Sequence, residues 1–171
     1  MNSYGDIKKT ITHEYLKDNY DYIETGFLSY KTKSKNGRIG ILKGNVAYDG
    51  YLRVSIKNTN MSYHRMIWLW HHKTLPKYID HINRIKSDNR IENLRETTTS
   101  QNMANVEKFK KNPSCVYKGV SFHKKHKRYI AHINYMGKLI HIGYFLDPKD
   151  AAKAYDEKAK SLWGEFACTN F

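Results

Sequence analysis

Cysteine is scarce in this sequence, and its scarcity excludes two common architectures. Only two cysteines occur among 171 residues, Cys115 and Cys168, and neither belongs to a C-x-x-C pair. A disulfide framework and a cysteine-based zinc finger are therefore both disfavoured. A chain with this cysteine usage suits a reducing cytosol, and we expect a cytoplasmic protein.

Long apolar runs are also absent. The first residues, MNSYGDIKKT, contain no apolar signal core, and no later run approaches the length that spans a bilayer. The sequence therefore predicts a soluble protein with no membrane partner.

Acidic residues are the third scarcity. Sixteen Asp and Glu face 30 Lys and Arg, which gives a formal net charge of +14. Residues 1–110 carry 19 basic and 11 acidic side chains (net +8), and residues 111–171 carry 11 and 5 (net +6). Basic charge alone could serve only solubility, but 14 tyrosines and 3 tryptophans interleaved with it indicate folded binding modules. Both halves are therefore expected to bind a polyanion.

The N-terminal half has the pattern of short strands followed by a helix. Between about residues 22 and 56, apolar stretches are separated by glycines, and residues 51–56 alternate as in a half-buried strand. Asp49-Gly50 is a hairpin turn signal. The next segment, SYHRMIWLWHH, has helical periodicity and is followed by a short strand expected at residues 78–80.

The C-terminal part has the pattern of a sheet followed by a helix. Strands rich in aromatic and β-branched residues are expected at 117–122, 129–135 and 139–145. Asp147 can cap a helix that has Pro148 at its first position, and Gly164 would end that helix. The helix would present an apolar stripe made of Ala151, Tyr155, Ala159 and Leu162.

The stretch from Tyr78 to Asn105, YIDHINRIKSDNRIENLRETTTSQNMAN, contains residues suited to phosphodiester hydrolysis. Asp80 and His81 are adjacent, and Asn93 and Asn102 follow at spacings of twelve and nine residues. A carboxylate and an amide oxygen can hold a hard divalent cation, and a histidine can deprotonate a water. Each residue alone is more often a turn, a helix cap or an exposed side chain. Together, at this spacing, they favour a catalytic site.

This pattern, with its NR-x-x-NLR core, resembles the HNH nucleases, in the homing-endonuclease branch where asparagine replaces the last histidine. The resemblance covers roughly residues 50–105 and implies two antiparallel strands and a helix around one metal. It implies that His81 is the general base and that Asn93 orients the loop that carries it. Asp80 and Asn102 would hold one Mg²⁺ or Mn²⁺, because both provide oxygen ligands.

Four basic residues near the motif are expected to contact DNA. His64 and Arg65 match a recurrent His-Arg step in these endonucleases, which implies a structural or phosphate-contacting role rather than metal ligation. Arg84 and Arg90 flank the site and could clamp phosphates. A solvated charged face is the alternative for these two arginines.

Four groups of residues, in order, mark the C-terminal segment: Tyr117-Lys118-Gly119-Val120, Ile142-Gly143-Tyr144-Phe145, Ala154-Tyr155-Asp156 and Asn170-Phe171. They resemble the Apetala-two/ethylene-response-factor (ERF) DNA-binding domain. That resemblance implies a three-stranded sheet in the major groove with one helix packed behind it. The residues expected to contact DNA are Lys118, Ser121, His123, Lys124, Lys125, Lys127 and Arg128.

The sequence as a whole predicts an α+β chain with an HNH nuclease domain at 1–107, a linker at 108–114 and an ERF-like domain at 115–171. The expected function is a site-specific endonuclease of homing or phage type that nicks or cuts double-stranded DNA in a bacterial or phage-infected cell. We expect a monomer without a small-molecule cofactor, with dimerisation as one route to a double-strand cut. The alternatives are a non-catalytic DNA-binding regulator with a remnant motif, and an RNA-binding protein, although no RNP-like or KH-like glycine motif is present.

Overall fold

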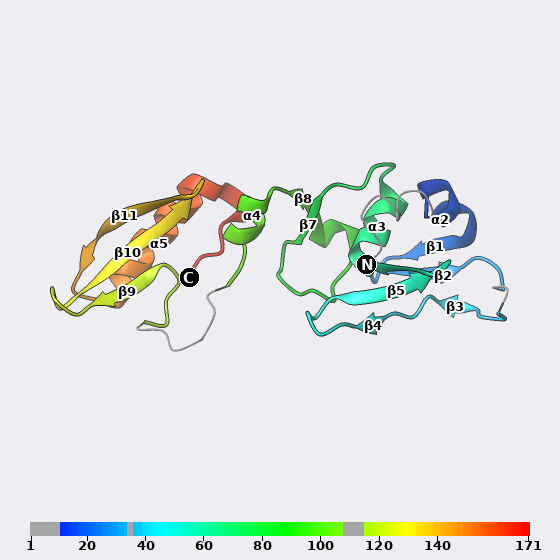
Figure 1. Cartoon of the computed structure of the whole chain (residues 1–171), viewed down its shortest axis with the longest axis horizontal. Coiled ribbons are helices and arrows are strands. Elements are labelled where there is room, and N and C mark those ends of the chain that lie inside the picture. Colours follow the sequence, from blue (N-terminus) through cyan, green and yellow to red (C-terminus); the bar gives the residue numbers. More distant parts are fainter. Residues whose placement is uncertain (1–10, 34–35, 108–114) are drawn as a thin grey trace. The chain divides into compact units, whose positions relative to one another are not determined.

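The computed structural model describes residues 11–33, 36–107 and 115–171, and it has a mixed α+β fold of small antiparallel sheets and few helices (Figure 1). The chain forms two compact units, Met1–Glu96 and Thr97–Phe171. The expected linker at 108–114 lies outside the described residues. The division between the units falls earlier than we expected, because the helix that follows Thr97 packs against elements of the C-terminal unit.

The first unit contains two three-stranded antiparallel sheets. The first sheet follows helix α2 (His13–Asn19) and contains β1 (Tyr20–Ile23), β2 (Phe27–Tyr30) and β3 (Gly40–Ile41), in that order. The second contains β4 (Asn45–Val46), β5 (Leu52–Ile56) and β6 (Thr59–Ser62), also in chain order. The remaining elements are helix α3 (Tyr63–His71), strand β7 (Tyr78–His81), the 3-10 turn η1 (Ile91–Asn93) and strand β8 (Leu94–Thr97), which pairs with β7.

The hairpin between β4 and β5 forms where the sequence predicts it. Val54 and Ile56 are buried whereas Arg53 and Ser55 are exposed, which confirms the alternation of a half-buried strand. The backbone N–H of Tyr51 donates to Oδ1 of Asp49 over 3.2 Å, and Gly50 in the turn has φ +82°. The expected helix and the expected strand at 78–80 are confirmed as α3 and β7.

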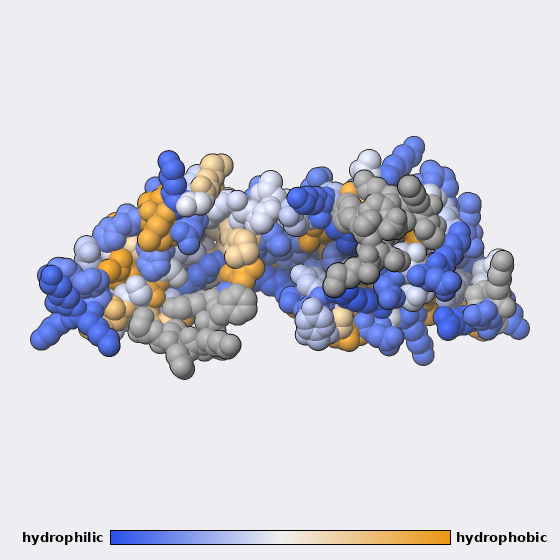
Figure 2. Space-filling view, in the orientation of Figure 1, coloured by the Kyte–Doolittle hydropathy of each residue, from blue (hydrophilic) through white to orange (hydrophobic). Residues whose placement is uncertain are grey.

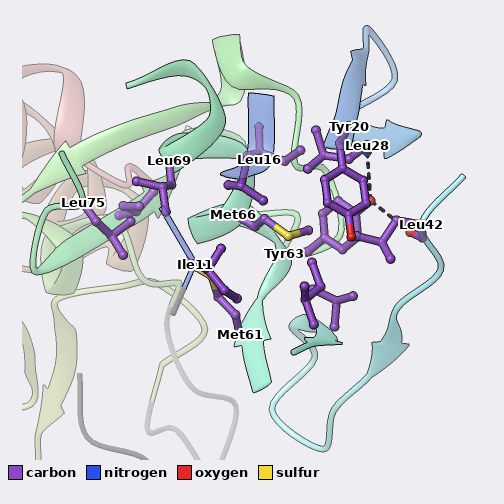
Figure 3. Packing of buried hydrophobic residues seen from close by; sticks show 14 of the residues in the cluster. Ile11, Leu16, Tyr20, Leu28, Leu42, Met61, Tyr63, Met66, Leu69 and Leu75 are labelled. Atoms are coloured by element: carbon purple, nitrogen blue, oxygen red, sulfur yellow. Dashed lines mark hydrogen bonds between the residues drawn. The ribbon is translucent and has the colours of Figure 1, made fainter. Parts of the chain in front are cut away.

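Tyr63, at the start of α3, joins three parts of the first unit. Its ring is fully buried, and its hydroxyl donates to the carbonyl oxygen of Leu42 over 3.0 Å (Figure 3). The same hydroxyl accepts from the backbone N–H of Leu28 over 2.9 Å. Met66 and Ile67, on the same helix, are also fully buried in this core. Helix α3 is thus fixed against the sheets before the chain reaches the motif.

The second unit is a three-stranded sheet with one long helix packed against it. Its strands pair antiparallel in the order β11 (Lys138–Phe145), β10 (Arg128–Tyr135) and β9 (Val120–His123). Helix α4 (Thr99–Ala104) opens the unit, and α5 (Pro148–Trp163) with the turn η2 (Gly164–Phe166) closes it. The three predicted strands and the long helix are confirmed, and α5 packs against all three strands (Figure 1).

The ends of α5 and its apolar stripe match the prediction. The Asp147 side chain accepts from the backbone N–H of Lys149 over 2.7 Å, and Pro148 occupies the first turn. Gly164 ends the helix with φ +54°, a conformation that favours glycine. The stripe residues Ala151, Tyr155 and Ala159 are buried against the sheet.

One glycine and the C-terminal residues fix how α5 meets the sheet. Gly119 has φ +72°, and a Cβ at this position would lie 1.9 Å from a ring carbon of Tyr155. The buried carboxylate of Asp156 accepts from the backbone N–H groups of Asn170 and Phe171 and from the Asn170 side chain. Oδ1 of Asn170 in turn accepts from the backbone N–H of Lys118 over 2.6 Å. The end of the chain therefore ties α5 to the segment before β9.

Within the described ranges, no helix combines the length and apolar character needed to cross a membrane.

Candidate active site

Asp80 and His81 are the last two residues of β7, and both lie in the interior of the first unit. Asp80 is 8% exposed and His81 is 3% exposed, although both are polar. Buried polar groups of this kind require hydrogen-bond partners. The partners come from β8 and from the loop between β7 and η1, residues 82–90, which we call the motif loop.

His81 lies in a buried cluster of rings and is bonded to the motif loop. Its Nε2 atom lies 3.2 Å from Oδ1 of Asn89, and its ring centroid is 5.1 Å from that of His64 and 5.8 Å from that of Tyr51. Burial lowers the pKa of His81, against the smaller raising effects of the Asn89 hydrogen bond and the Asp80 charge. The imidazole is therefore neutral at neutral pH, the state that a general base requires.

Asn93 braces the motif loop at both ends. Its Oδ1 accepts from the backbone N–H of Asn83 over 2.9 Å. Its Nδ2 donates to Oδ1 of Asn83 over 2.9 Å and to the backbone oxygen of Asp88 over 2.7 Å. Asn93 is 6% exposed, so these bonds are shielded from water. The bonding pattern is the one expected for a residue that orients the loop next to His81.

Asp80 is held by an arginine from β8. Nη2 of Arg95 lies 3.0 Å and Nε 3.2 Å from Oδ2 of Asp80, and both side chains are only 10% exposed. Arg95 is the last residue of the NR-x-x-NLR core, and that position did not indicate that its guanidinium would bond to the acidic residue. The pair keeps the buried carboxylate charge compensated.

The oxygen donors fit a hard divalent cation. Asp80 offers a carboxylate and Asn102 an amide oxygen, and such groups suit Mg²⁺ or Mn²⁺. A carboxylate has about four acceptor sites, so a cation can share Asp80 with Arg95. The described residues contain no group of three or more His, Cys, Asp or Glu side chains suited to hold a metal.

Asn102 belongs to the second unit, on helix α4. That helix begins with a capping box in which the side chains of Thr98 and Gln101 each bond the other residue's backbone N–H. At its other end, the backbone oxygen of Ala104 accepts from the backbone N–H of Cys168 over 3.2 Å. The pairing of Asn102 with Asp80 stays a prediction, because the two residues lie in different units.

The four residues predicted near the motif have different roles. His64 is buried, and burial is the main reason that its pKa falls to about 3, which suits a structural role. Arg65 donates to the backbone oxygens of Lys77 and Pro76 and so fastens α3 to the segment before β7. Arg90 is exposed and pairs with Asp88 over 2.7 Å. Arg84 is exposed in the motif loop with φ +66°.

In the second unit, the predicted DNA-contacting residues gather around the β9–β10 turn, with one exception. Ser121 and His123 alternate with buried Val120 along β9, so they face away from α5. The turn that follows β9 contains the exposed residues Lys124, Lys125 and Lys127, and the exposed Arg128 begins β10. Figure 2 shows hydrophilic side chains at the end of this unit where the turn lies.

The exception is Lys118. Its Nζ donates to the backbone oxygens of Ala104 and Val106 over 2.7 and 2.6 Å, at the end of α4. The ammonium group therefore satisfies helix-end carbonyls rather than reaching into solvent, and we leave Lys118 out of the proposed DNA-contacting set.

Sequence reasoning missed two residues around the site. Asn89 lies inside the NR-x-x-NLR core, yet its side chain was not singled out as a partner of His81. Gly26, in the turn between β1 and β2, has φ +86°, and a Cβ there would lie 2.5 Å from the backbone nitrogen of Arg90. A glycine between two expected strands is the sequence signal for the positive φ of Gly26. That signal does not indicate that Gly26 packs against the backbone of Arg90.

Comparisons with known proteins found a family model and a solved structure that are similar to parts of this chain. Residues 62–104 match the family model described as HNH endonuclease. A solved structure described as DNA binding and cleavage by the HNH homing endonuclease I-HmuI is similar, with 25% sequence identity and a TM-score of 0.40. That similarity covers 51% of this chain and 51% of the other, so the chain matches about half of that enzyme's length. The comparison with curated proteins gave no match.

The family match supports a DNA-cleaving hydrolase. It begins just before α3 and ends with α4, so it contains all four residues of the predicted catalytic set. It does not extend to residues 115–171, so it does not support the expected ERF-like domain.

Proposed function

We propose that this protein is a site-specific DNA endonuclease of homing or phage type that hydrolyses phosphodiester bonds with His81 as general base. One observation carries the proposal. A neutral, buried histidine stands beside a buried carboxylate at the end of β7, in a segment that matches HNH endonucleases. A histidine in this state can take the proton of an attacking water.

The roles of the chain's own residues follow from their contacts. His81 would accept the proton, and Asn93 would hold the motif loop in place through its bonds to Asn83 and Asp88. Asp80 and Asn102 would hold one Mg²⁺ or Mn²⁺. When bound, that cation supplies stabilisation of the charge that develops on the phosphate and on the leaving oxygen. Arg95 would keep the Asp80 carboxylate oriented.

We also propose that the second unit is an ERF-like module that binds duplex DNA through the β9–β10 side of its sheet. The exposed lysines at 124, 125 and 127, with Arg128, would neutralise phosphates. Ser121 and His123 would lie against base edges. A monomer with one catalytic site would nick one strand, and a second encounter or a dimer would complete a double-strand cut. Such an enzyme would act in the cytoplasm of a bacterial or phage-infected cell.

The experiment is cleavage of supercoiled plasmid that carries the genomic neighbourhood of this gene, with Mg²⁺ or Mn²⁺ and with EDTA. Wild type is expected to give open circles or linear product only with the cation. His81→Ala is expected to bind DNA as wild type does and to lose cleavage by about 10² to 10⁴, the usual contribution of a general base.

The matched control is His72→Ala, which removes an exposed imidazole from the same unit. Cleavage at the wild-type rate by His81→Ala would contradict the assignment of the base. Retained DNA binding without any cleavage by wild type would favour the non-catalytic regulator instead.

A further inference from the structure

We propose that Asn89 is a positioning residue for His81: it fixes the orientation of the imidazole and keeps the hydrogen on Nε2, so that Nδ1 carries the lone pair. This inference rests on the proposed function of His81 as the base. Asn89 is among the largest fully buried side chains of the first unit, although it is polar and lies in a loop.

The hydrogen bonds of Asn89 determine which way its amide points. Its Nδ2 donates to the backbone oxygen of Ser87 over 3.3 Å, and a carbonyl oxygen can only accept. The other amide atom, Oδ1, therefore accepts, and it faces Nε2 of His81 over 3.2 Å. The bond to Ser87 therefore determines the orientation of the Asn89 amide independently of His81.

The acceptor at Nε2 selects the tautomer of a neutral imidazole. A neutral ring has one N–H and one lone pair, and a nitrogen that faces Oδ1 must carry the hydrogen. The lone pair then belongs to Nδ1, which is the atom that would take a proton from water. The bond made by one ring nitrogen determines which form the other adopts, a general property of functional histidines.

Aromatic neighbours also contact His81, and their effect on the ring differs from that of Asn89. The ring of His64 meets that of His81 edge-on, with an interplanar angle of 71°, and the plane of the Tyr51 ring is tilted by 42° to that of His81. These neighbours restrict the ring by shape, but an edge or face contact does not distinguish Nδ1 from Nε2. A hydrogen bond from an amide oxygen does distinguish them.

The β1–β2 hairpin holds Asn89 in place. The turn residue Gly26 packs so closely on the motif loop that a Cβ would lie 2.7 Å from the carbonyl carbon of Asn89. The hydroxyl of Tyr22, on β1, accepts from the backbone N–H of Ile91 over 3.1 Å. Two contacts from a segment about 65 residues earlier in the chain thus set the backbone on both sides of Asn89.

The test compares Asn89→Leu, Asn89→Asp and the control Ser87→Ala. Leucine removes the acceptor at His81, whereas aspartate retains an oxygen there and loses the donor to the Ser87 carbonyl. Ser87→Ala keeps that carbonyl and changes only an exposed side chain of the same loop. Steady-state nicking gives kcat and KM, and long-range proton–nitrogen NMR of the histidine rings, assigned with a His81→Gln spectrum, reports the tautomer directly.

For Asn89→Leu we expect kcat to fall about tenfold or more, within the 10² to 10⁴ that a general base contributes, with KM little changed. The His81 signals should change from one tautomer to a mixture. Asn89→Asp should recover the tautomer and a large part of kcat, and Ser87→Ala should match wild type. If Asn89→Leu does not fold, Asn89→Ala removes the same acceptor and takes its place.

The two proposals fail in different ways. An unchanged His81 tautomer in the folded leucine or alanine variant would overturn the role of Asn89, whatever the cleavage rate. Wild-type protein that shows no metal-dependent nicking would overturn the proposed nuclease function, and the NMR result would still decide whether Asn89 orders the ring.

Discussion

Replacement of Asn93 by alanine and by aspartate would test the bracing of the motif loop in detail. The Asn93 side chain makes three hydrogen bonds, one to the Asn83 backbone, one to the Asn83 side chain and one to the Asp88 backbone, over 2.7 to 2.9 Å. At a net of about 1 kcal/mol each, their loss in Asn93→Ala destabilises the closed loop by about 3 kcal/mol. A change of about 1.4 kcal/mol is tenfold in an equilibrium, so the open loop gains about 100-fold in population.

Asn93→Asp has nearly the same shape but should not rescue the loop. One carboxylate oxygen can still accept from the Asn83 backbone N–H. The other would replace Nδ2 and face two acceptors, Oδ1 of Asn83 at 2.9 Å and the Asp88 backbone oxygen at 2.7 Å. Two hydrogen bonds become repulsive contacts around a buried charge, so the loss should equal or exceed that of alanine.

Amide hydrogen exchange at Asn83 measures the effect locally. Its backbone N–H is bonded to Asn93, and its protection should fall about 100-fold in both variants while the core amides around Tyr63 keep theirs. Plasmid nicking should fall in parallel. If the Asn83 amide in Asn93→Asp exchanges at the wild-type rate and the variant nicks plasmid at the wild-type rate, the reasoning is refuted. Asn89→Asp is expected to keep much of the cleavage activity, because one oxygen still accepts from the ring N–H of His81. Asn93→Asp is expected to lose activity, so the same substitution distinguishes the roles of the two asparagines.

The second unit supplies the remaining predictions. Replacement of Lys124, Lys125 and Lys127 together by alanine should weaken duplex binding and reduce the slope of log affinity against log salt by about 2.7, since each lost phosphate contact contributes about 0.9; an unaltered slope would place the contacts elsewhere. Gly119→Ala should destabilise the second unit by about 2 to 5 kcal/mol, because a Cβ would lie 1.9 Å from the Tyr155 ring at a φ that disfavours L side chains. Urea denaturation followed by far-UV circular dichroism measures this loss, and a midpoint equal to wild type would contradict it.

Local patterns in the sequence were sufficient to predict several of the secondary structure elements. The strand that carries Asp80 and His81, the helix α3, the three strands of the second unit and the capped helix α5 all follow from periodicity, turn signals and caps that involve residues close in the chain. The resemblance to the HNH nucleases implied that Asn93 orients the loop beside His81, and the side chain of Asn93 does bond to Asn83 and Asp88 in that loop.

The tertiary structure decided which side chains meet across longer distances. In the structure, Arg95 bonds to the Asp80 carboxylate, and the ammonium group of Lys118 bonds to backbone oxygens at the end of α4. Helix α4, which carries Asn102, belongs to the second unit and not to the first. The tertiary structure also brought Gly26 against the backbone of the motif loop and aimed Asn89 at His81. These contacts depend on side-chain direction and on the packing of segments distant in sequence, and neither residue type nor spacing specifies them. The sequence by itself therefore determined which chemical groups are available to this protein, whereas only the packed fold determined which atom of His81 is bonded and by which residue.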